Sequence, residues 1–413
     1  MKGRTTLRRQ STWRLLAALL ALALVAAACG DDAGESTTTA GATDTTAGST
    51  DTTEGGEATT TTEGAQPVDS CEATIGFIGP ITGDVAFIGG VQLNWFNYAL
   101  DTWNEEMGYD FQMVEGDNQF DTAQSATLAQ QFLDNTAMVA AVGPAGSDQV
   151  DAAGAVYEAG DPNFTFISPS STRSGITAQY TGMFRTVPTD DDQGPTTADF
   201  LVAQGAENVF VVDDQSSYST GLADSVEENL TAANVTVTTD SVAQDVTDFS
   251  ALVGTIPDEA NFVYLPWQVA ANGQIFANQM TEQGKEAVIF GSDGMDSDDF
   301  TEPGSYIAAF APDISAIEGS QSILDGYLEQ YDDTNTFGPP VYAAARVIFE
   351  AIDRVCQTGQ TPDRANVQAE VRNTDQADSI LGSPISFTED GDLAEGRFFI
   401  FQIQEDGSKT LVE

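Results

Sequence analysis

The sequence has no histidine and few basic side chains, and these two shortages exclude several classes of function. Of its 413 residues, 14 are Lys or Arg and 64 are Asp or Glu. Without histidine, the chain lacks the most common general base of enzymes and the most common zinc ligand. A surface with so few cations repels a phosphate backbone, so we expect no nucleic-acid partner. The apolar run 15–28 is shorter than the roughly 20 residues that span a bilayer, and no other run is long enough.

Enzyme and metal-binding motifs are also missing. The sequence has no Gly-x-Gly-x-x-Gly after its first expected strand, no phosphate loop and no Gly-x-Ser-x-Gly turn, and a Ser-His-Asp triad cannot form. The acidic run 293–299 lacks the ligand order and the closing Glu of a twelve-residue calcium loop. We therefore expect a protein that is not an enzyme and that uses no metal and no cofactor.

The N-terminus has the pattern of a secretory signal. Five basic side chains precede the apolar run, and small residues stand directly before Cys29. The pattern resembles a bacterial lipoprotein signal, whose cleavage leaves the cysteine first to receive lipid. A plain signal peptide has no need of a cysteine at this point. We expect residues 1–28 to be removed and lipid on Cys29 to anchor the chain to the outer side of the bacterial cell membrane.

The next segment, residues 29–70, is rich in Thr, Gly and Ala and has almost no large apolar side chains. Such a segment cannot bury enough surface to offset the entropy of ordering, so we expect a flexible tether. An extracytoplasmic location permits a disulfide between the two remaining cysteines, Cys71 and Cys356, and two buried free thiols are the alternative.

The charge of the mature chain is strongly negative. After cleavage, nine basic residues remain against 64 acidic ones, a net charge of −55. Such an excess is typical of proteins from salty habitats, where salt screens the self-repulsion. An ordinary acidic secreted protein is the alternative interpretation.

From about residue 70 onward, short apolar runs alternate with helix-like segments over a length sufficient for two domains. This alternation predicts an α/β fold with parallel sheets flanked by helices. The expected strands are 73–78, 111–114, 138–142, 164–167, 208–212, 235–238, 262–265 and 287–290. The expected helices are 90–105, 123–134, 150–158, 221–232, 249–256, 273–283 and 340–356. Residues 396–403 and 409–412, with an Asp-Gly turn between them, predict a C-terminal β-hairpin.

Polar turns follow several expected strands, at the edge where open parallel sheets bind ligands. Ser147 follows the third strand, and Ser170 and Thr172 follow the fourth, so hydroxyl and free N–H groups suited to a carboxylate gather there. Tyr218 precedes a helix, and Asp293 follows a strand, where a carboxylate can hold an ammonium group. Alternatively, Ser147 and Thr172 are ordinary helix caps and Asp293 is an exposed loop acid.

Short motifs in a constant order carry a resemblance to a known family. Residues 72–413 resemble the periplasmic branched-chain amino-acid (Leu/Ile/Val) binding proteins, which are the substrate receptors of ATP-driven importers. The matching segments are IGFIGPITG (75–83), DNQ (117–119), VGPAGS (142–147), ISPSST (167–172), FRT (184–186), QGP (193–195), YSTGLA (218–223), DFSAL (248–252) and GSDG (291–294). Each motif is short, and their collinearity along the chain carries the resemblance.

The resemblance implies a ligand site that holds a free amino acid. The family's carboxylate-binding serine falls on Ser147, and its paired contacts fall on Ser170 and Thr172. The cleft tyrosine falls on Tyr218, and the ammonium-binding acid, commonly Glu in the family, falls on Asp293.

The pocket for the ligand's side chain departs from the family pattern. A second cleft aromatic, often Tyr, aligns with Gln268, which lies beside Trp267. The aromatic of the first loop corresponds to Phe87. Because one scaffold hosts many ligands, the resemblance leaves amides, urea and aromatic acids as alternatives. Gln268 either indicates a more polar ligand or faces solvent.

The resemblance also implies the two-lobed type I periplasmic binding protein fold, with parallel sheets flanked by helices. Three interlobe crossings are expected near residues 186–189, 312–316 and 382–387. Lobe one is then residues 71–187 with 316–382, and lobe two is residues 188–315 with 383–413. Cys71 and Cys356 fall in the same lobe, which favours the disulfide.

The expected function is that of a monomeric receptor whose lobes close by hinge motion on a free amino acid, branched-chain or a related small zwitterion. It then delivers the ligand to the permease and ATPase subunits of an ABC importer. A sensor that presents its ligand to a signalling receptor is the alternative function, and an enzyme on the same scaffold is a third.

Overall fold

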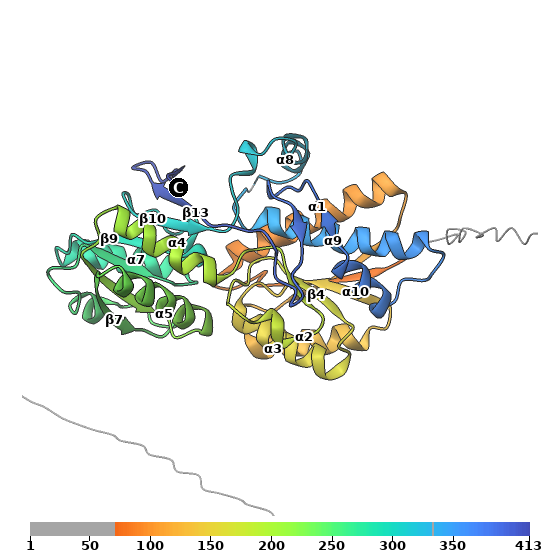
Figure 1. Ribbon diagram of the computed structural model, residues 1–413, viewed down its shortest axis with the longest axis horizontal. Coiled ribbons are helices and arrows are strands. Elements are labelled where there is room, and N and C mark those ends of the chain that lie inside the picture. The colour runs from red at the N-terminus through yellow and green to blue at the C-terminus, as the bar shows by residue number, and fades with distance from the viewer. Residues whose placement is uncertain (1–70, 333) are drawn as a thin grey trace, which may run out of the picture. The chain divides into compact units, whose positions relative to one another are not determined.

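The computed structural model describes residues 71–332 and 334–413, which form a parallel sheet and a mixed sheet, both covered by helices (Figure 1). The expected signal, the lipidated Cys29 and the tether lie outside the described residues. Within those residues, no helix combines the length and the apolar character needed to cross a membrane.

The first sheet has five strands, all parallel. In spatial order they are β2 (Gln112–Asp117), β1 (Thr74–Gly79), β3 (Met138–Val142), β4 (Thr165–Ser168) and β5 (Met183–Arg185). Central β3 is an unbroken apolar run, and all its residues are buried, as a parallel strand covered on both faces requires. Edge strand β2 is mostly exposed or half-buried. The sheet therefore buries its centre most completely.

The helices of the first sheet lie on both of its faces. They are α1 (Ala86–Met107), α2 (Thr122–Asp134), α3 (Ser147–Gly160), α9 (Gly338–Gln357) and α10 (Arg364–Arg372). Figure 1 shows α1 and α9 packed together on one face and α2 and α3 packed together on the other. We call this sheet and its helices lobe one.

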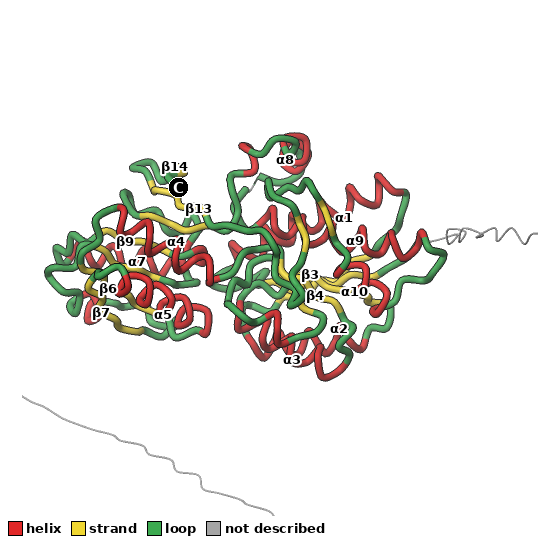
Figure 2. Tube along the Cα trace, in the orientation of Figure 1, coloured by secondary structure: helices red, strands yellow, loops and turns green. Residues whose placement is uncertain are grey.

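The second sheet has seven strands and ends in a hairpin. In spatial order they are β14 (Lys409–Leu411), β13 (Phe399–Ile403), β10 (Tyr306–Ala309), β9 (Val288–Gly291), β8 (Phe262–Leu265), β6 (Asn208–Asp213) and β7 (Thr236–Ser241). The hairpin of β13 and β14 joins β10 in antiparallel fashion, and the other pairs are parallel (Figure 2). Its helices are α4 (Asp190–Ala203), α5 (Ser217–Ala232), α6 (Ser250–Val253) and α7 (Ala270–Glu282). We call this sheet and its helices lobe two.

The α/β alternation expected from the sequence is confirmed, and each expected strand and helix is present. The sequence pattern misses α4, β5, β10 and α10, together with α8 (Gln321–Leu328) and the short pair of β11 (Asp375–Gln376) and β12 (Ile385–Ser386). Helix α4 begins with three aspartates and contains Gly194 and Pro195, which are typical of a turn. Aspartates in a first turn are favoured by the helix dipole, and tertiary contacts decide that the segment is helical.

The chain passes between the two sheets three times: after β5, after β10 and between β12 and β13. The third passage lies later than the expected residues 382–387. Ile385 and Ser386 still pair with β11, and Asp392 forms an ion pair of 2.5 Å with Arg185 at the end of β5. The chain therefore stays with lobe one as far as Asp392.

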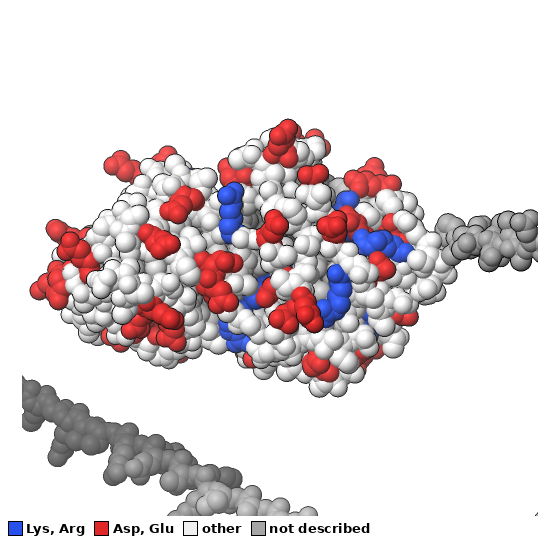
Figure 3. Space-filling model, in the orientation of Figure 1, with Lys and Arg blue, Asp and Glu red and all other residues white. Residues whose placement is uncertain are grey.

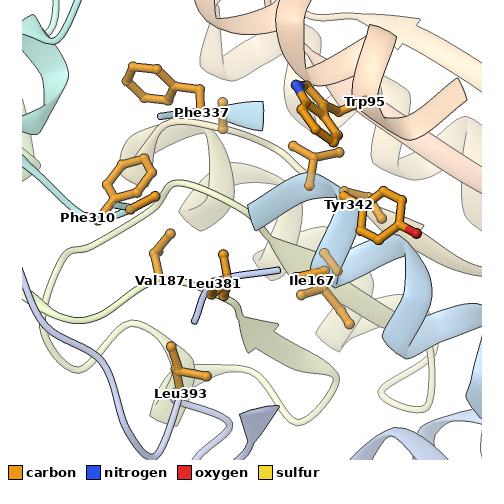
Figure 4. Packing of buried hydrophobic residues seen from close by; sticks show 14 of the residues in the cluster. Trp95, Ile167, Val187, Phe310, Phe337, Tyr342, Leu381 and Leu393 are labelled. Carbon is orange, nitrogen blue, oxygen red and sulfur yellow. The ribbon is translucent and has the colours of Figure 1, made fainter. Parts of the chain in front are cut away.

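A buried apolar cluster lies where the three passages meet. Val187 follows β5 in the first passage, Phe310 follows β10 in the second, and Leu393 precedes β13 in the third. Figure 4 shows these side chains in one cluster with Phe337 and Leu381. The rings of Phe310 and Phe337 meet edge to face at 5.3 Å. The passages are thus held together by an apolar core.

A disulfide joins Cys71 to Cys356, with a distance of 5.8 Å between the Cα atoms. Both residues are buried, one just before β1 and the other near the end of α9. The expected pairing is confirmed, and it ties two distant segments of lobe one.

Candidate functional site

Asp293 is the centre of a buried polar cluster at the carboxyl edge of the second sheet. Its Oδ1 accepts hydrogen bonds from Tyr218 Oη at 2.6 Å and from Gln193 Nε2 at 2.5 Å. Tyr218 lies in the first turn of α5, and Gln193 lies near the start of α4. Tyr218 is 2% exposed and Asp293 is 4% exposed. Asp293 is therefore an interior group and not an exposed loop acid.

A glycine brings the turn after β9 against the turn after β8. A Cβ atom at Gly294 would lie 2.4 Å from the carbonyl oxygen of Trp267, so only glycine permits this approach. Ser292 Oγ also donates to that carbonyl, at 3.3 Å. The turn that carries Asp293 thus lies directly beside Gln268.

A second buried acid, Asp190, belongs to the same cluster. It is the first residue of α4, and its Oδ1 lies 3.5 Å from the Gln193 Nε2 that also binds Asp293. Within the described residues, Asp190 Oδ2 and Gln193 Oε1 have no hydrogen-bond partner. Sequence reasoning missed Asp190, because it begins a run of three aspartates in a strongly acidic chain.

Burial shifts the ionisation of both acids. Burial raises the pKa of Asp293 to about 6, against the hydrogen bonds from Tyr218 and Gln193, which lower it. Burial and the neighbouring charge of Asp293 raise the pKa of Asp190 well above its ordinary value. Two carboxyl groups that share one amide donor in a buried site favour a cation beside them.

Hydroxyl groups form the facing cluster at the carboxyl edge of the first sheet. Ser147 Oγ accepts a hydrogen bond from Ser171 Oγ at 3.0 Å, which leaves the proton of Ser147 to donate. Ser170 Oγ accepts from Gln92 Nε2 of α1 at 3.0 Å and donates to the Ala145 carbonyl at 3.1 Å. Sequence reasoning missed Gln92 and Ser171.

Ser147 and Thr172 are not helix caps. Gly146 is the N-cap of α3, with no side-chain cap bond, and Ser147 is the first helical residue. Thr172 lies in a loop, fully buried, and within the described residues its Oγ1 has no hydrogen-bond partner. The first-turn N–H groups of α3 also have no partner within their own helix. This edge therefore offers donors.

The turn after β3 needs glycine. Gly143 has φ +95°, and a Cβ atom there would lie 2.0 Å from the carbonyl oxygen of Ile78 in β1. The turn consequently passes against the end of β1 and brings Ser147 to the same edge as the loop after β4.

The hydroxyl and acid clusters meet at one backbone hydrogen bond. The N–H of Asp190 donates to the carbonyl oxygen of Thr172 at 2.8 Å. The structure thus brings five expected site residues into one polar region, in which Ser170 is half-buried and Ser147, Thr172, Tyr218 and Asp293 are buried. Donors lie on the side of lobe one and carboxylates on the side of lobe two.

The remaining expected residues lie around this region or apart from it. Trp267 packs in the core of lobe two against Phe249 and Phe276, and its Nε1 donates to the Val212 carbonyl at 2.7 Å. Its indole is therefore satisfied by the protein and is not brought to the acid cluster.

Gln268 lies in a polar network, and Phe87 lies in apolar surroundings. Gln268 Oε1 accepts a hydrogen bond from Gln244 Nε2 at 3.2 Å. Gln244 Nε2 also donates to Asp214 Oδ2, at 2.9 Å. Phe87 is half-buried near the start of α1 and packs against apolar residues of both lobes. A polar network thus continues along the edge of lobe two beyond Asp293.

The acidic run 293–299 has protein partners. Asp296 is buried and pairs with Lys409 Nζ at 2.5 Å, and it also accepts from Thr336. Across residues 71–332 and 334–413, no group of three or more His, Cys, Asp or Glu side chains is arranged to hold a metal ion.

Two α/β lobes with three connecting passages, and polar groups gathered at the carboxyl edges of both sheets, define a two-lobed binding protein. The chain belongs to the periplasmic binding protein family, whose sequence model matches residues 72–408.

Individual relatives agree with this assignment. The chain is 25% identical over 349 residues to the Leu/Ile/Val-binding protein BraC3 of Rhizobium johnstonii, covering 81% of this chain and 93% of that protein. It is 26% identical over 361 residues to a leucine-, isoleucine-, valine-, threonine- and alanine-binding protein of Pseudomonas aeruginosa, covering 82% and 92%. The crystal structure of LivJ from Streptococcus pneumoniae in complex with isoleucine shares the fold, with a TM-score of 0.74, 20% identity, and coverage of 83% and 99%.

Proposed function

We propose that this chain is an extracytoplasmic solute receptor of an ABC importer, and that it binds a free amino acid, branched-chain or a related small zwitterion. One observation carries the proposal: within the described residues, buried polar atoms without a hydrogen-bond partner of good geometry gather in one polar region. They include Thr172 Oγ1 of lobe one and Asp190 Oδ2 of lobe two, and these residues lie close enough that the Thr172 hydroxyl lowers the pKa of the Asp190 carboxyl against the effect of burial. Buried polar groups are normally hydrogen-bonded, so these atoms are suited to a ligand.

The two sides match the two charges of an amino acid. Ser147, Ser170 and Thr172, with the first N–H groups of α3, take the α-carboxylate, because a helix N-terminus favours an anion. Asp293 and Asp190 take the α-ammonium through charge-assisted hydrogen bonds. Tyr218 orients the carboxylate of Asp293, to which it is bonded.

The ligand's side chain lies toward Phe87 and Gln268 in this proposal. The relatives named for leucine, isoleucine and valine support an aliphatic side chain. The relative that is also named for threonine and alanine supports tolerance of small or polar side chains, in keeping with Gln268 at this edge. The protein makes and breaks no bond in the ligand.

Cellular placement follows from the N-terminal sequence in the same proposal. Residues 1–28 are the lipoprotein signal, lipid on Cys29 anchors the chain, and residues 29–70 are the tether. The folded lobes work as a monomer outside the membrane, and the ligand-bound form docks on permease subunits. ATPase partners act on the inner side.

Calorimetric titration of the purified protein tests the proposal. Isoleucine, leucine, valine, threonine and alanine are the ligands, with urea and acetamide as uncharged comparisons. Asp293→Asn is expected to weaken amino-acid binding by about 10- to 150-fold, since a hydrogen bond to a charged group is worth roughly 1.5–3 kcal/mol.

The matched control is Asp299→Asn, which removes an exposed acid from the same acidic run, 293–299, and is expected to leave affinity unchanged. Equal affinity in Asp293→Asn and wild type, or binding of the uncharged amides alone, contradicts the proposal.

A further inference from the structure

Three residues fasten lobe one to lobe two directly beside the candidate site. Arg173 follows β4 and Asp148 lies in the first turn of α3, both in lobe one, whereas Ser217 is the first residue of α5 in lobe two. Arg173 Nη1 donates to Ser217 Oγ at 2.6 Å. Asp148 accepts from the backbone N–H of Ser217 at 3.2 Å and also from its hydroxyl.

We propose that Arg173, Asp148 and Ser217 form a latch that holds the two lobes closed and sets how long a ligand stays bound. Each latch residue is the immediate chain neighbour of a site residue: Asp148 follows Ser147, Arg173 follows Thr172, and Ser217 precedes Tyr218. Closure of the latch and assembly of the ligand site therefore involve the same three segments. The proposal deepens the proposed function and rests on it only in taking the site between these segments as the ligand site.

The electrostatics of the latch favour its closed form. The Asp148 carboxylate lies in the first turn of α3 and also accepts from the first N–H of α5. Helix N-termini stabilise anions, so this one carboxylate is favoured by two helices from different lobes. Arg173 lies 3.9 Å from the same carboxylate and adds a positive charge.

Lobe one also holds Arg173 through contacts that do not involve lobe two. Its Nη2 donates to Asp151 of α3 at 3.1 Å, and its backbone carbonyl accepts from the buried Arg185 at 2.9 Å. Tyr180 Oη donates to Asp151 as well, at 2.5 Å. These contacts remain when the lobes separate, whereas the bonds to Ser217 exist only when the lobes meet.

Bonds present in only one of two states shift the balance toward that state. The latch therefore stabilises the closed form with or without ligand, and a bound ligand leaves only after the latch opens. Arg173, Asp148 and Ser217 are positioning residues in this account, since they act through the site residues beside them.

Two measurements on the full chain test the latch. The first is the dissociation rate of isoleucine, measured by stopped-flow displacement, for wild type, Arg173→Ala and Ser217→Ala. We expect dissociation about tenfold faster in either variant, the loss of roughly one hydrogen bond to a charged group. The two changes together are expected to add little to either one, because both remove the same contact.

The second measurement needs no ligand, so it separates failure of the latch from failure of the proposed function. Spin labels are attached at two exposed positions, through Ala155→Cys in α3 and Asp224→Cys in α5. Pulsed electron paramagnetic resonance then measures the distance between the labels, and so between the lobes. Ligand-free wild type is expected to contain a short-distance population that Arg173→Ala and Ser217→Ala lose. Arg173→Lys is expected to keep part of it, because the charge is retained.

Arg354→Ala is the matched control, since it removes an arginine whose partner, Glu370, lies in the same lobe. It is expected to change neither the dissociation rate nor the distances. Identical distance distributions in ligand-free wild type and Arg173→Ala overturn the latch, whatever the ligand proves to be. An equal effect of Arg354→Ala on the distances also overturns the latch, because the change in distance would then follow from the lost positive charge and not from the contact with Ser217.

Discussion

The two lobes share one architecture, and they differ in how their charges are arranged. Six of the nine basic residues from residue 71 onward are arginines of lobe one, and the other three, Lys285, Arg397 and Lys409, lie in lobe two. On the face shown in Figure 3, the outer part of lobe two carries Asp and Glu side chains and no Lys or Arg. Lobe one therefore holds twice as many basic side chains as lobe two.

Lobe one uses its cations to fix the donor side of the site. Arg185 is fully buried, pairs with Asp392, and donates to the carbonyl oxygens of Ser171 and Arg173 on either side of Thr172. The hydroxyl loop is therefore held before any ligand arrives. Lobe two holds Asp293 and Asp190 through Gln193, and across residues 71–332 and 334–413 no basic side chain is hydrogen-bonded to either acid.

This difference teaches how one scaffold separates the two ends of a zwitterion. In the proposed function, the lobe that carries the hydroxyl cluster receives the anion, and the lobe that carries Asp293 and Asp190 receives the cation. A ligand with both charges then joins the two lobes. The following predictions are ordered from the largest expected effect to the smallest.

Removal of the disulfide should weaken lobe one alone. Cys71→Ser with Cys356→Ser is expected to lower the free energy of unfolding by about 2–5 kcal/mol, because a long loop of the unfolded chain is no longer constrained. Urea unfolding followed by circular dichroism measures the change. An unchanged midpoint in oxidised and reduced wild type would show that the bridge does not stabilise the fold.

Loss of one hydroxyl should weaken the donor side without unfolding it. Thr172→Val is expected to reduce amino-acid affinity by about tenfold or more, as one bond to the ligand's carboxylate is lost. The matched control is Thr165→Val, which removes a buried hydroxyl at the opposite end of β4. Calorimetric titration decides: equal effects of both changes contradict the role of Thr172.

Acid should weaken the carboxylate side. Because burial raises the pKa of Asp293 to about 6, it is protonated at about pH 5 and mostly ionised at about pH 7. An ammonium group needs the ionised form, so we expect affinity to rise about tenfold across this range, with proton release on binding. Titrations in buffers of different ionisation enthalpy measure both quantities.

The same shift affects the stability of the ligand-free protein, with a defined sign. Between the ordinary pKa of an aspartate, about 3.9, and the raised value, the folded state binds a proton that the unfolded state lacks. The contribution of Asp293 to stability is therefore full below about pH 4 and is lost as the pH rises through 6.

For ligand binding, an affinity that is the same from about pH 5 to about pH 7 would contradict a role for the ionised Asp293 carboxylate.

Much of this fold could be predicted from the sequence because its core elements are strongly patterned. The apolar run of β3 and the amphipathic α9 admit one interpretation each. Helix α4 could not be predicted, because its start of aspartates, Gly194 and Pro195 is locally typical of a turn and tertiary contacts decide its structure. The third passage was expected too early, because the pairing of β11 with β12 involves only two residues on each strand.

The site was predictable where position in the fold determines chemistry. Ser147, Thr172 and Asp293 end or follow strands, so the topology alone brings them to the carboxyl edges. The role of Asp190 was not predictable, because nothing in the local sequence distinguishes it from Asp191 and Asp192. Only its burial in the structure sets it apart. Trp267 and Gln268 are neighbours in sequence, and the hydrogen bond to the Val212 carbonyl turns the indole into the core.

One measurement tests the central claim most directly, which is that the two lobes divide the charges of a zwitterion. It is a calorimetric comparison of leucine with leucinamide, which lacks the carboxylate, and with 4-methylpentanoate, which lacks the ammonium group. The account predicts that leucine binds and that each analogue binds at least about tenfold more weakly, since each loses charge-assisted bonds at one lobe. Binding of either analogue as tightly as leucine would contradict the account.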